Sequence, residues 1–343
     1  MKPGIRRIRT FAAVLLVLLT LPRATSAQIP RYDSLYAFGD SLADNGNILI
    51  TSQFLHVDPA PPPSATPHRA YFLGRFSNGP VAFEYLWQLL SGQAPGSARG
   101  LTPFLASPML GATGAVNFAF GGTGTPYIDQ TPGGLSAPGL KGQVELFRLA
   151  LRGRKPSKRA LYAIVAGAND YRDDAFNQPM NPAVVVQNIA DAVNTLYQLG
   201  ARDVLVLNLP DLGLVPANRG NPAPATFLST VHNTLLAGAL NALAASLPKL
   251  NLIQIDLNHV LSLLPAGMDL TTPALDALFP PGSLPPPYPP GFLMSACLFI
   301  APATCADAPT FDVGQQFLYW DILHPTTAGH RVLGEYLYRA LAR

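Results

Sequence analysis

A serine that could act as a nucleophile lies near the amino-terminal end of the chain. Ser41 stands in the run Phe-Gly-Asp-Ser-Leu-Ala-Asp-Asn-Gly-Asn, directly after a short apolar stretch. A serine can attack a carbonyl carbon when a neighbouring base takes its proton and a third group orients that base. The same residue types are the commonest in turns and helix caps, so an ordinary turn is the alternative interpretation. Catalysis at Ser41 therefore depends on partners elsewhere in the chain.

Two of the six histidines follow an aspartate by three residues, a spacing that places both side chains on one face of a turn. The pairs are Asp256 with His259 and Asp321 with His324. His259 leads into a helical pattern and is also typical of a surface or capping residue. His324 precedes a proline, which favours an extended backbone before a new helix and leaves the imidazole on a loop. We therefore favour His324 as the partner of Ser41. The remaining histidines lack such a partner and are predicted to be structural or exposed, namely His56, His68, His232 and His330.

Acyl transfer also needs hydrogen-bond donors for the oxyanion that develops on the carbonyl. The glycine run 121–124 follows a second apolar stretch, and Asn169 follows a third. A glycine amide can approach a substrate closely, and asparagine offers a side-chain amide. Glycines after a strand also simply make turns, and asparagine often caps a helix. The glycine run lacks the Gly-x-Gly-x-x-Gly spacing of a dinucleotide site.

The elements that must position these residues are predicted from hydrophobic patterning. Short apolar runs followed by Gly, Asn, Pro or Asp are typical of buried parallel strands. There are five, at Ser34 to Phe38, Ala115 to Phe120, Ala160 to Val165, Asp203 to Leu209 and Asn251 to Ile255. Helical patterns lie between them, at Asn181 to Leu199 and Phe227 to Leu247. This alternation predicts an α/β fold, a doubly wound, flavodoxin-like parallel five-stranded sheet with helices on both faces, whose ligands bind at the carboxyl ends of the strands.

Two proline-rich segments interrupt the pattern, near residues 58–67 and 279–291. Neither can form a helix or a central strand. We expect both to be insertions that wall or cover a site within one domain spanning residues 28–343. Ordinary surface loops are the alternative.

The first 27 residues have the anatomy of a signal peptide. A basic start precedes an apolar run from Phe11 to Leu21 and then a small-residue stretch, which fits cleavage before Gln28. The run is shorter than the ~20 residues that span a bilayer. We therefore expect a secreted or periplasmic protein with no transmembrane anchor after cleavage, and an uncleaved anchor is the alternative.

The formal charge of +3 depends on this segment, because five of the 23 Lys and Arg residues lie in it. Residues 28–343 keep 18 Lys and Arg against 20 Asp and Glu, a formal charge of −2. This balance gives no support to nucleic-acid binding, and any transient contact with a lipid surface would rest on apolar side chains.

The only two cysteines, Cys297 and Cys305, could form one disulfide in an oxidising compartment. Two cysteines without a nearby histidine cannot build a tetrahedral zinc site, so we expect no metal there.

Four elements occur in one order along the chain. They are Gly-Asp-Ser-Leu at 39–42, the glycine run at 121–124, Gly-x-Asn-Asp at 167–170 and Asp-x-x-His-Pro-Thr at 321–326. Together they resemble the GDSL family of SGNH hydrolases, particularly its secreted bacterial lipase, esterase and phospholipase branch. The stretches 74–80 and 208–213 also look like this family's.

The resemblance implies a serine hydrolase that cleaves carboxylic esters through an acyl-enzyme, without a metal or organic cofactor. Ser41 would be the nucleophile, His324 the general base and Asp321 its orienting carboxylate. The oxyanion donors would be the Ser41 amide, the amide of Gly122 or Gly121, and the Asn169 side chain.

The substrate class stays open at this point. Apolar residues at 292–300 favour the acyl chains of lipid or phospholipid esters over sugar acetates, and packing of these residues in a local core is the alternative interpretation. Small acyl esters are included in the predicted substrate class. A carbohydrate acetylesterase on the same scaffold and a non-catalytic exported binding protein are the alternatives.

Overall fold

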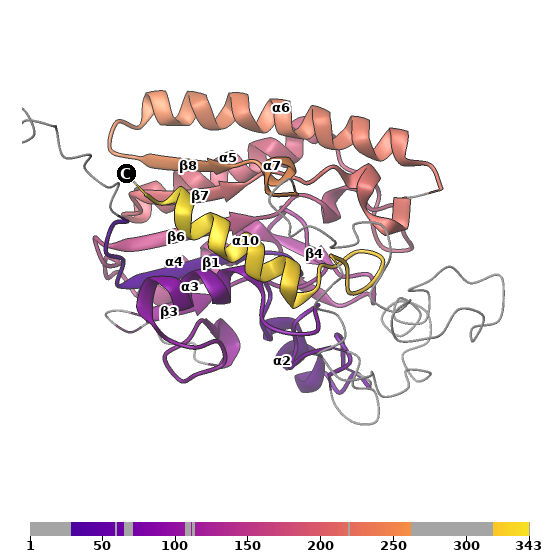
Figure 1. The fold of residues 1–343 in the computed structure, drawn as a ribbon, viewed down its shortest axis with the longest axis horizontal. Coiled ribbons are helices and arrows are strands. Elements are labelled where there is room, and N and C mark those ends of the chain that lie inside the picture. Colours follow the sequence, from indigo (N-terminus) through magenta and orange to yellow (C-terminus); the bar gives the residue numbers. More distant parts are fainter. Residues whose placement is uncertain are drawn as a thin grey trace, which may run out of the picture.

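The computed structural model describes residues 29–58, 60–64, 71–106, 111, 114–218, 220–261 and 318–342. Their main sheet is entirely parallel, with helices on both faces (Figure 1). Its strands are β1 (Ser34–Gly39), β2 (Thr102–Pro103), β3 (Gly114–Asn117), β6 (Ala160–Val165), β7 (Asp203–Leu207) and β8 (Asn251–Ile255). Their order in space is β2-β3-β1-β6-β7-β8. The five predicted strands thus take the flavodoxin-like order 2-1-3-4-5, which confirms the predicted fold class.

The sheet has one strand more than the predicted five. β2 contains only two residues and pairs with β3 at the edge of the sheet. A strand this short leaves no alternating pattern in the sequence, and its proline is tolerated because it lies at an edge. A separate antiparallel pair, β4 (Ile128–Gln130) with β5 (Ser136–Pro138), also had no predicted counterpart.

Two predicted strands end earlier in the structure than the sequence indicated. β3 stops at Asn117 and β7 at Leu207, although apolar residues continue beyond both. The backbone amides of Phe118 and Phe120 still donate to the carbonyls of Ala37 and Gly39. The chain therefore follows β1 beyond the regular ladder and carries the glycine run to the carboxyl edge of the sheet.

The helices cover the sheet in two layers. The described helices are α2 (Asn47–Phe54), α3 (Ala82–Ser91), α4 (Leu140–Leu151), α5 (Pro182–Leu199), α6 (Pro222–Ser246), α7 (Leu257–Leu261) and α10 (Thr327–Ala340). One core joins α4, α5 and α6 to the strand side chains that include Tyr36 and Phe38. The other joins α3, α7 and α10 to the alternate side chains, including Leu35 and Ala37. In Figure 1, α10 crosses in front of the sheet.

Both predicted helices are present. α5 begins at Pro182 after Asn181, whose side chain accepts the N–H of Ala183 and so acts as the expected cap. α6 begins at Pro222, five residues before the predicted start at Phe227. Its first turn carries little apolar periodicity, so the sequence pattern located only the later, packed turns.

Several sequence predictions concern residues outside the described part of the chain. These are the signal peptide at 1–27, the second proline-rich segment at 279–291 and the Cys297–Cys305 pair. Within the described residues, no helix combines the length and the apolar character needed to cross a bilayer.

Candidate active site

Ser41 lies in a tight turn at the carboxyl end of β1. Gly39 has φ +146° and its Cα lies so close to the carbonyl of Val165 in β6 that a Cβ there would collide with it. The carbonyl of Asp40 then accepts the amides of Ala43 and Asp44, and its carboxylate accepts the amide of Leu42. This hydrogen bonding presents the Ser41 side chain at the edge of the sheet.

His324 lies on a small hairpin formed by residues 318–326. The hairpin is closed by a bridge between Tyr319 and Pro325 and by the amide of Thr326 donating to Leu318. Inside it, one oxygen of Asp321 accepts the backbone amides of Leu323 and His324, each at 2.7 Å. The Asp-x-x-His spacing thus forms a turn around the carboxylate, and α10 begins directly afterwards with Thr326 as its cap.

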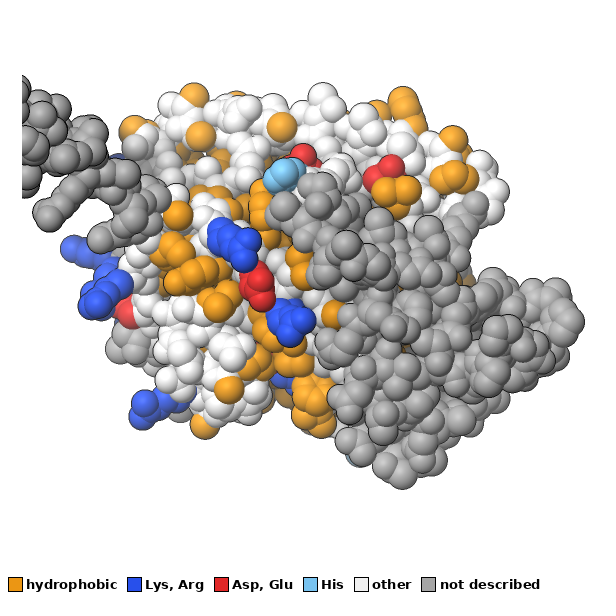
Figure 2. All heavy atoms as spheres, viewed as in Figure 1, with side chains coloured by type: hydrophobic (Ala, Val, Ile, Leu, Met, Phe, Trp, Pro, Cys, Tyr) orange, Lys and Arg blue, Asp and Glu red, His pale blue; other side chains and the backbone are white. Residues whose placement is uncertain are grey.

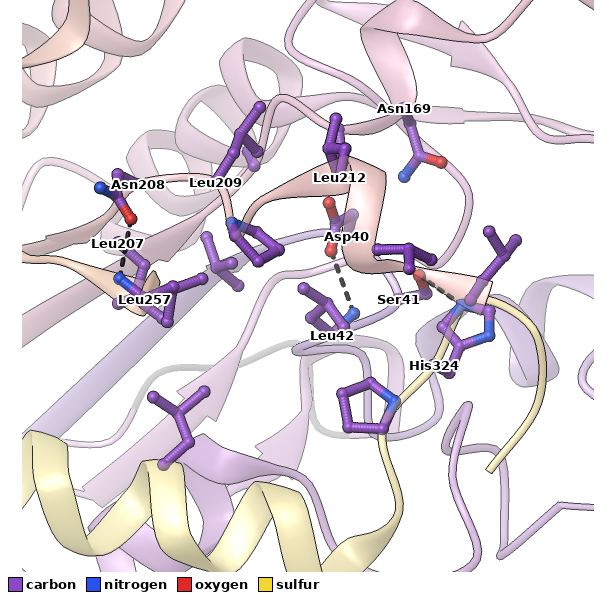
Figure 3. A pocket seen from close by; sticks show the side chains of 18 of the residues that line it. Asp40, Ser41, Leu42, Asn169, Leu207, Asn208, Leu209, Leu212, Leu257 and His324 are labelled. Carbon is purple, nitrogen blue, oxygen red and sulfur yellow. Dashed lines mark hydrogen bonds between the residues drawn. The ribbon is translucent and has the colours of Figure 1, made fainter. Parts of the chain in front are cut away.

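The hairpin brings His324 to Ser41 (Figure 3). Nε2 of His324 lies 2.9 Å from Oγ of Ser41, and Nδ1 lies 2.8 Å from Oδ2 of Asp321. All three residues are buried, with 7%, 5% and 1% exposure for Ser41, His324 and Asp321. Burial raises the pKa of Asp321, but the charge of His324 and hydrogen bonds from His324, Leu323 and Tyr71 outweigh it, so the pKa lies below its usual value. This arrangement can activate a hydroxyl as a nucleophile.

The glycine run and Asn169 end close to this site. The amide of Gly121 donates to Oδ2 of Asp44 at 2.8 Å, whereas in the described structure no hydrogen bond uses the amides of Gly122 or Ser41. Gly122 has φ +78°. The Asn169 side-chain amide donates one hydrogen bond to the carbonyl of Thr123 at 3.1 Å, which leaves its second N–H available.

A cavity of about 370 Å³ opens beside Ser41, a size typical of small-molecule sites. Asp40, Asn169 and His324 lie at one part of its wall, and most of the remaining described lining is apolar (Figure 3). Part of that apolar lining comes from β7, the turn after it, α7 and α10, and includes Leu207, Leu209, Leu212, Val215, Leu257, Val260 and Leu333. Burial raises the pKa of Asp40 to about 6.

The alternative histidine, His259, has a different environment. It is exposed in α7, its ring packs edge-on against Tyr336, and the carboxylate of Asp256 accepts from Asn208 and Asn258. The structure therefore brings His324, and not His259, to Ser41.

Two other histidines are buried. The Tyr171 hydroxyl lies 2.7 Å from Nδ1 of His232, and burial lowers the pKa of His232 to about 4. Neither ring nitrogen of His330 has a hydrogen-bond partner in the described structure, and burial together with the charge of His324 lowers the pKa of His330 to about 3. Both imidazoles are therefore neutral at pH 7.

Two residues that contact this site were not predicted from the sequence. Tyr71 donates its hydroxyl hydrogen to Asp321, and Asp44 holds the amide of Gly121. Asp44 lies three residues after Ser41 in the same motif, so its place in the sequence could have indicated a role at the site. Tyr71 follows the first proline-rich segment, and no local sequence pattern marks it. Four residues of the family-like stretch 208–213 line the cavity, namely Asn208, Leu209, Pro210 and Leu212. Within the described residues, no three side chains of His, Cys, Asp or Glu form a group that could hold a metal ion.

The model of the GDSL-like lipase/acylhydrolase family matches residues 35–337, which is most of the chain. The chain belongs to this family. The predicted family membership is confirmed, and it supports the predicted enzyme class, ester hydrolysis.

Curated relatives of this GDSL chain include a phosphatidylcholine-sterol acyltransferase of Aeromonas hydrophila, 33% identical over 67% of this chain and 60% of that protein. Esterase EstA of Pseudomonas aeruginosa is 28% identical over 96% of this chain and 50% of that protein. The chain thus spans only half to three-fifths of the length of these two relatives. A GDSL esterase/lipase of Arabidopsis thaliana is 25% identical over 93% of both chains.

Among solved structures, a catalytic mutant of the acetylxylan esterase Axe2 from Geobacillus stearothermophilus is similar to this GDSL chain with a TM-score of 0.43. The two share 14% identity, over 91% of this chain and 95% of that one. The family assignment rests on the sequence match.

Proposed function

We propose that this protein hydrolyses carboxylic esters with Ser41 as the nucleophile. The main support for this proposal is a chain of contacts that runs from Ser41 Oγ through the His324 imidazole to the Asp321 carboxylate. These three residues are buried beside an apolar cavity. His324 Nε2 takes the serine proton as Oγ attacks the carbonyl carbon, and Asp321 stabilises the imidazolium that forms. The imidazolium then protonates the leaving alcohol, and water cleaves the acyl-enzyme by the same route.

The proposed oxyanion donors are the amides of Ser41 and Gly122 and the side chain of Asn169. Gly122 is preferred to Gly121 because the Gly121 amide is already held by Asp44. A donor that is not engaged in the resting protein can bind the developing negative charge without first breaking another hydrogen bond.

The proposed substrates are esters with an apolar acyl chain, including lipids and phospholipids. The described part of the cavity beyond Ser41 is mostly aliphatic, which favours an acyl chain over the hydroxyl-rich ring of a sugar. A carbohydrate acetylesterase is the second candidate. We also propose export through the amino-terminal signal segment, and a lipid surface as a transient partner.

Nucleic acid is not among the proposed partners. On the face seen in Figure 2, the Lys and Arg side chains of the described residues form separate groups and no continuous basic patch. Nucleic-acid binding draws on clustered positive charge, which this face of the described structure lacks.

Hydrolysis of a p-nitrophenyl ester by the wild type and by Ser41→Ala tests the proposal. We expect the variant to lose at least about 10⁴-fold in kcat while its circular dichroism is unchanged. Unchanged turnover by a folded Ser41→Ala protein would overturn it. Rates on acetyl, octanoyl and phospholipid substrates then separate the two substrate classes, because strict preference for acetyl would favour the carbohydrate acetylesterase.

A further inference from the structure

The Tyr71 hydroxyl contacts the carboxylate of Asp321 beside His324. The residue is fully buried, and its hydroxyl donates to Oδ2 of Asp321 at 2.7 Å. This is the same oxygen that lies 2.8 Å from Nδ1 of His324. Burial, and then the charge and hydrogen bond of Asp321, hold the pKa of Tyr71 well above its usual value, so the phenol keeps the proton that it donates.

With Tyr71 in place, the Asp321 carboxylate has a full set of donors. Oδ1 accepts the amides of Leu323 and His324, and Oδ2 accepts from His324 Nδ1 and from Tyr71. An ionised carboxylate offers about four acceptor sites. Removal of any one donor therefore leaves a buried charge short of a partner and free to change its orientation.

Tyr71 is itself fixed by its surroundings. Its backbone amide donates to the carbonyl of Pro63 at 2.8 Å, and its ring lies 6.2 Å from the ring of Phe76. Phe76 lies in turn 5.1 Å from the imidazole of His324, and its edge occupies the space where Gly121 would carry a Cβ. One aromatic ring thus separates the histidine from the loop that follows β3.

The stretch 74–80 contacts the other side of the His324 hairpin. Ser77 donates to the carbonyl of Pro325 at 2.9 Å, and Asn78 accepts the amide of Thr327 at 2.8 Å. This stretch is anchored to α3 by a buried ion pair between Arg75 and Glu84. Segment 71–80, for which the sequence predicted no role, therefore holds both the carboxylate and the start of α10.

We propose that Tyr71 is a positioning residue that fixes the Asp321 carboxylate and weakens its hold on the His324 imidazolium. The inference rests on the proposed function of Ser41 and His324. A carboxylate that shares its charge with a phenol attracts the imidazolium less strongly.

Other titratable groups of the described structure face the same histidine. Asp40, in the turn after β1, interacts electrostatically with His324 and with Asp170, and His330 in α10 interacts electrostatically with His324. A substitution at Tyr71 leaves these three groups in place, so a change in pH dependence would report the phenol contact.

The test compares the pH profile of kcat/KM for Tyr71→Phe with that of the wild type. We expect the acidic limb to move to higher pH by about half a unit, kcat to fall about tenfold and KM to change little. Tyr85→Phe is the matched control. The Tyr85 hydroxyl lies 2.6 Å from Oγ1 of Thr327, so this variant also loses a tyrosine hydrogen bond near the hairpin but leaves Asp321 untouched.

Incorporation of 3-fluorotyrosine at position 71 keeps the shape of the residue and makes the phenol a stronger donor. The acidic limb should then move to lower pH, opposite to the effect of Tyr71→Phe. This measurement tests the proposal even if the Tyr71→Phe variant does not fold. Equal profiles for wild type and Tyr71→Phe, a shift of the same size in Tyr85→Phe, or a fluorotyrosine shift toward higher pH would each overturn the proposal.

A readout that needs no turnover separates this proposal from the proposed function. The low-field proton NMR signal of the His324 Nδ1–H, recorded in Ser41→Ala, should shift when Tyr71→Phe is added. If the signal shifts but Ser41→Ala is still an active esterase, the proposed role of Ser41 is wrong, whereas the positioning role of Tyr71 at Asp321 is supported. If it does not shift, the positioning role of Tyr71 fails.

Discussion

The carboxylate of Asp44 accepts the backbone amide of Gly121 at 2.8 Å and so ties the loop after β1 to the loop after β3. The same carboxylate accepts the amides of Gly46, Asn47 and Ile48 at the start of α2. One buried side chain therefore sets the relative position of the two loops that carry the proposed nucleophile and oxyanion donors.

Asp44→Asn should accordingly lower kcat about tenfold and the free energy of unfolding by about 1–3 kcal/mol, because an amide nitrogen cannot accept the N–H groups that now meet a carboxylate oxygen. Ester hydrolysis and urea denaturation measure the two effects. Asp174→Asn is the control, since Asp174 also accepts two backbone amides in a turn, those of Phe176 and Asn177. Equal kcat values for Asp44→Asn and the wild type would contradict this role.

Asn169→Ala should lower kcat about 10²- to 10³-fold and leave KM nearly unchanged, because an oxyanion donor acts mainly on the transition state. Steady-state kinetics on a p-nitrophenyl ester provide the measurement. Asn188→Ala serves as the control, since the Asn188 amide donates to Thr125, also after the glycine run. A kcat for Asn169→Ala within twofold of the wild type would remove Asn169 from the mechanism.

Leu212→Trp should shorten the acyl chain that the protein prefers. Leu212 lines the cavity, and an indole there fills space that a long chain would need. The ratio of kcat/KM for octanoyl over acetyl esters should fall at least about tenfold. Leu214→Trp, two residues away at a side chain that is 55% exposed, should leave the ratio unchanged. Equal ratios in all three proteins would place the acyl chain elsewhere.

The free energy of unfolding of His330→Leu should fall less than that of the wild type as the pH becomes acidic. Burial lowers the pKa of His330 to about 3 in the folded protein, below the ordinary histidine value near 6.5. The neutral imidazole is therefore compatible with folding above pH 6.5, and stability is lost as the pH falls below 6.5 because the unfolded chain binds the proton more readily. At pH 5 the loss is about 2 kcal/mol. Urea unfolding at pH 8 and pH 5 should give a smaller difference for the variant than for the wild type.

His259→Gln controls for the removal of an imidazole, because His259 is exposed. Parallel stability curves for His330→Leu and the wild type would show that the His330 imidazole does not titrate as its burial implies.

The positions of the five longer parallel strands and of the residues that follow them could be predicted because they leave local signals in the sequence. Each of these strands is a short apolar run, and Ser41 and Asn169 lie within four residues of the ends of two of them. The pairing of Asp321 with His324 could also be predicted from local sequence, because His324 lies three positions after Asp321 and a single turn brings the two side chains together.

Contacts between distant segments left no such signal. The Tyr71–Asp321 hydrogen bond joins residues 250 positions apart, and the choice between Gly121 and Gly122 depended on where the Asp44 carboxylate lies. The edge strand β2 was missed because two residues have no periodicity. These features follow from packing in three dimensions, which hydrophobic patterning along one chain does not encode.

The most direct test of the central claim is labelling with a fluorophosphonate probe, followed by mass spectrometry of the tryptic peptides. We expect one adduct, on Ser41, with labelling abolished in Ser41→Ala and strongly slowed in His324→Ala. An adduct on another residue, or equal labelling of wild type and Ser41→Ala, would contradict it.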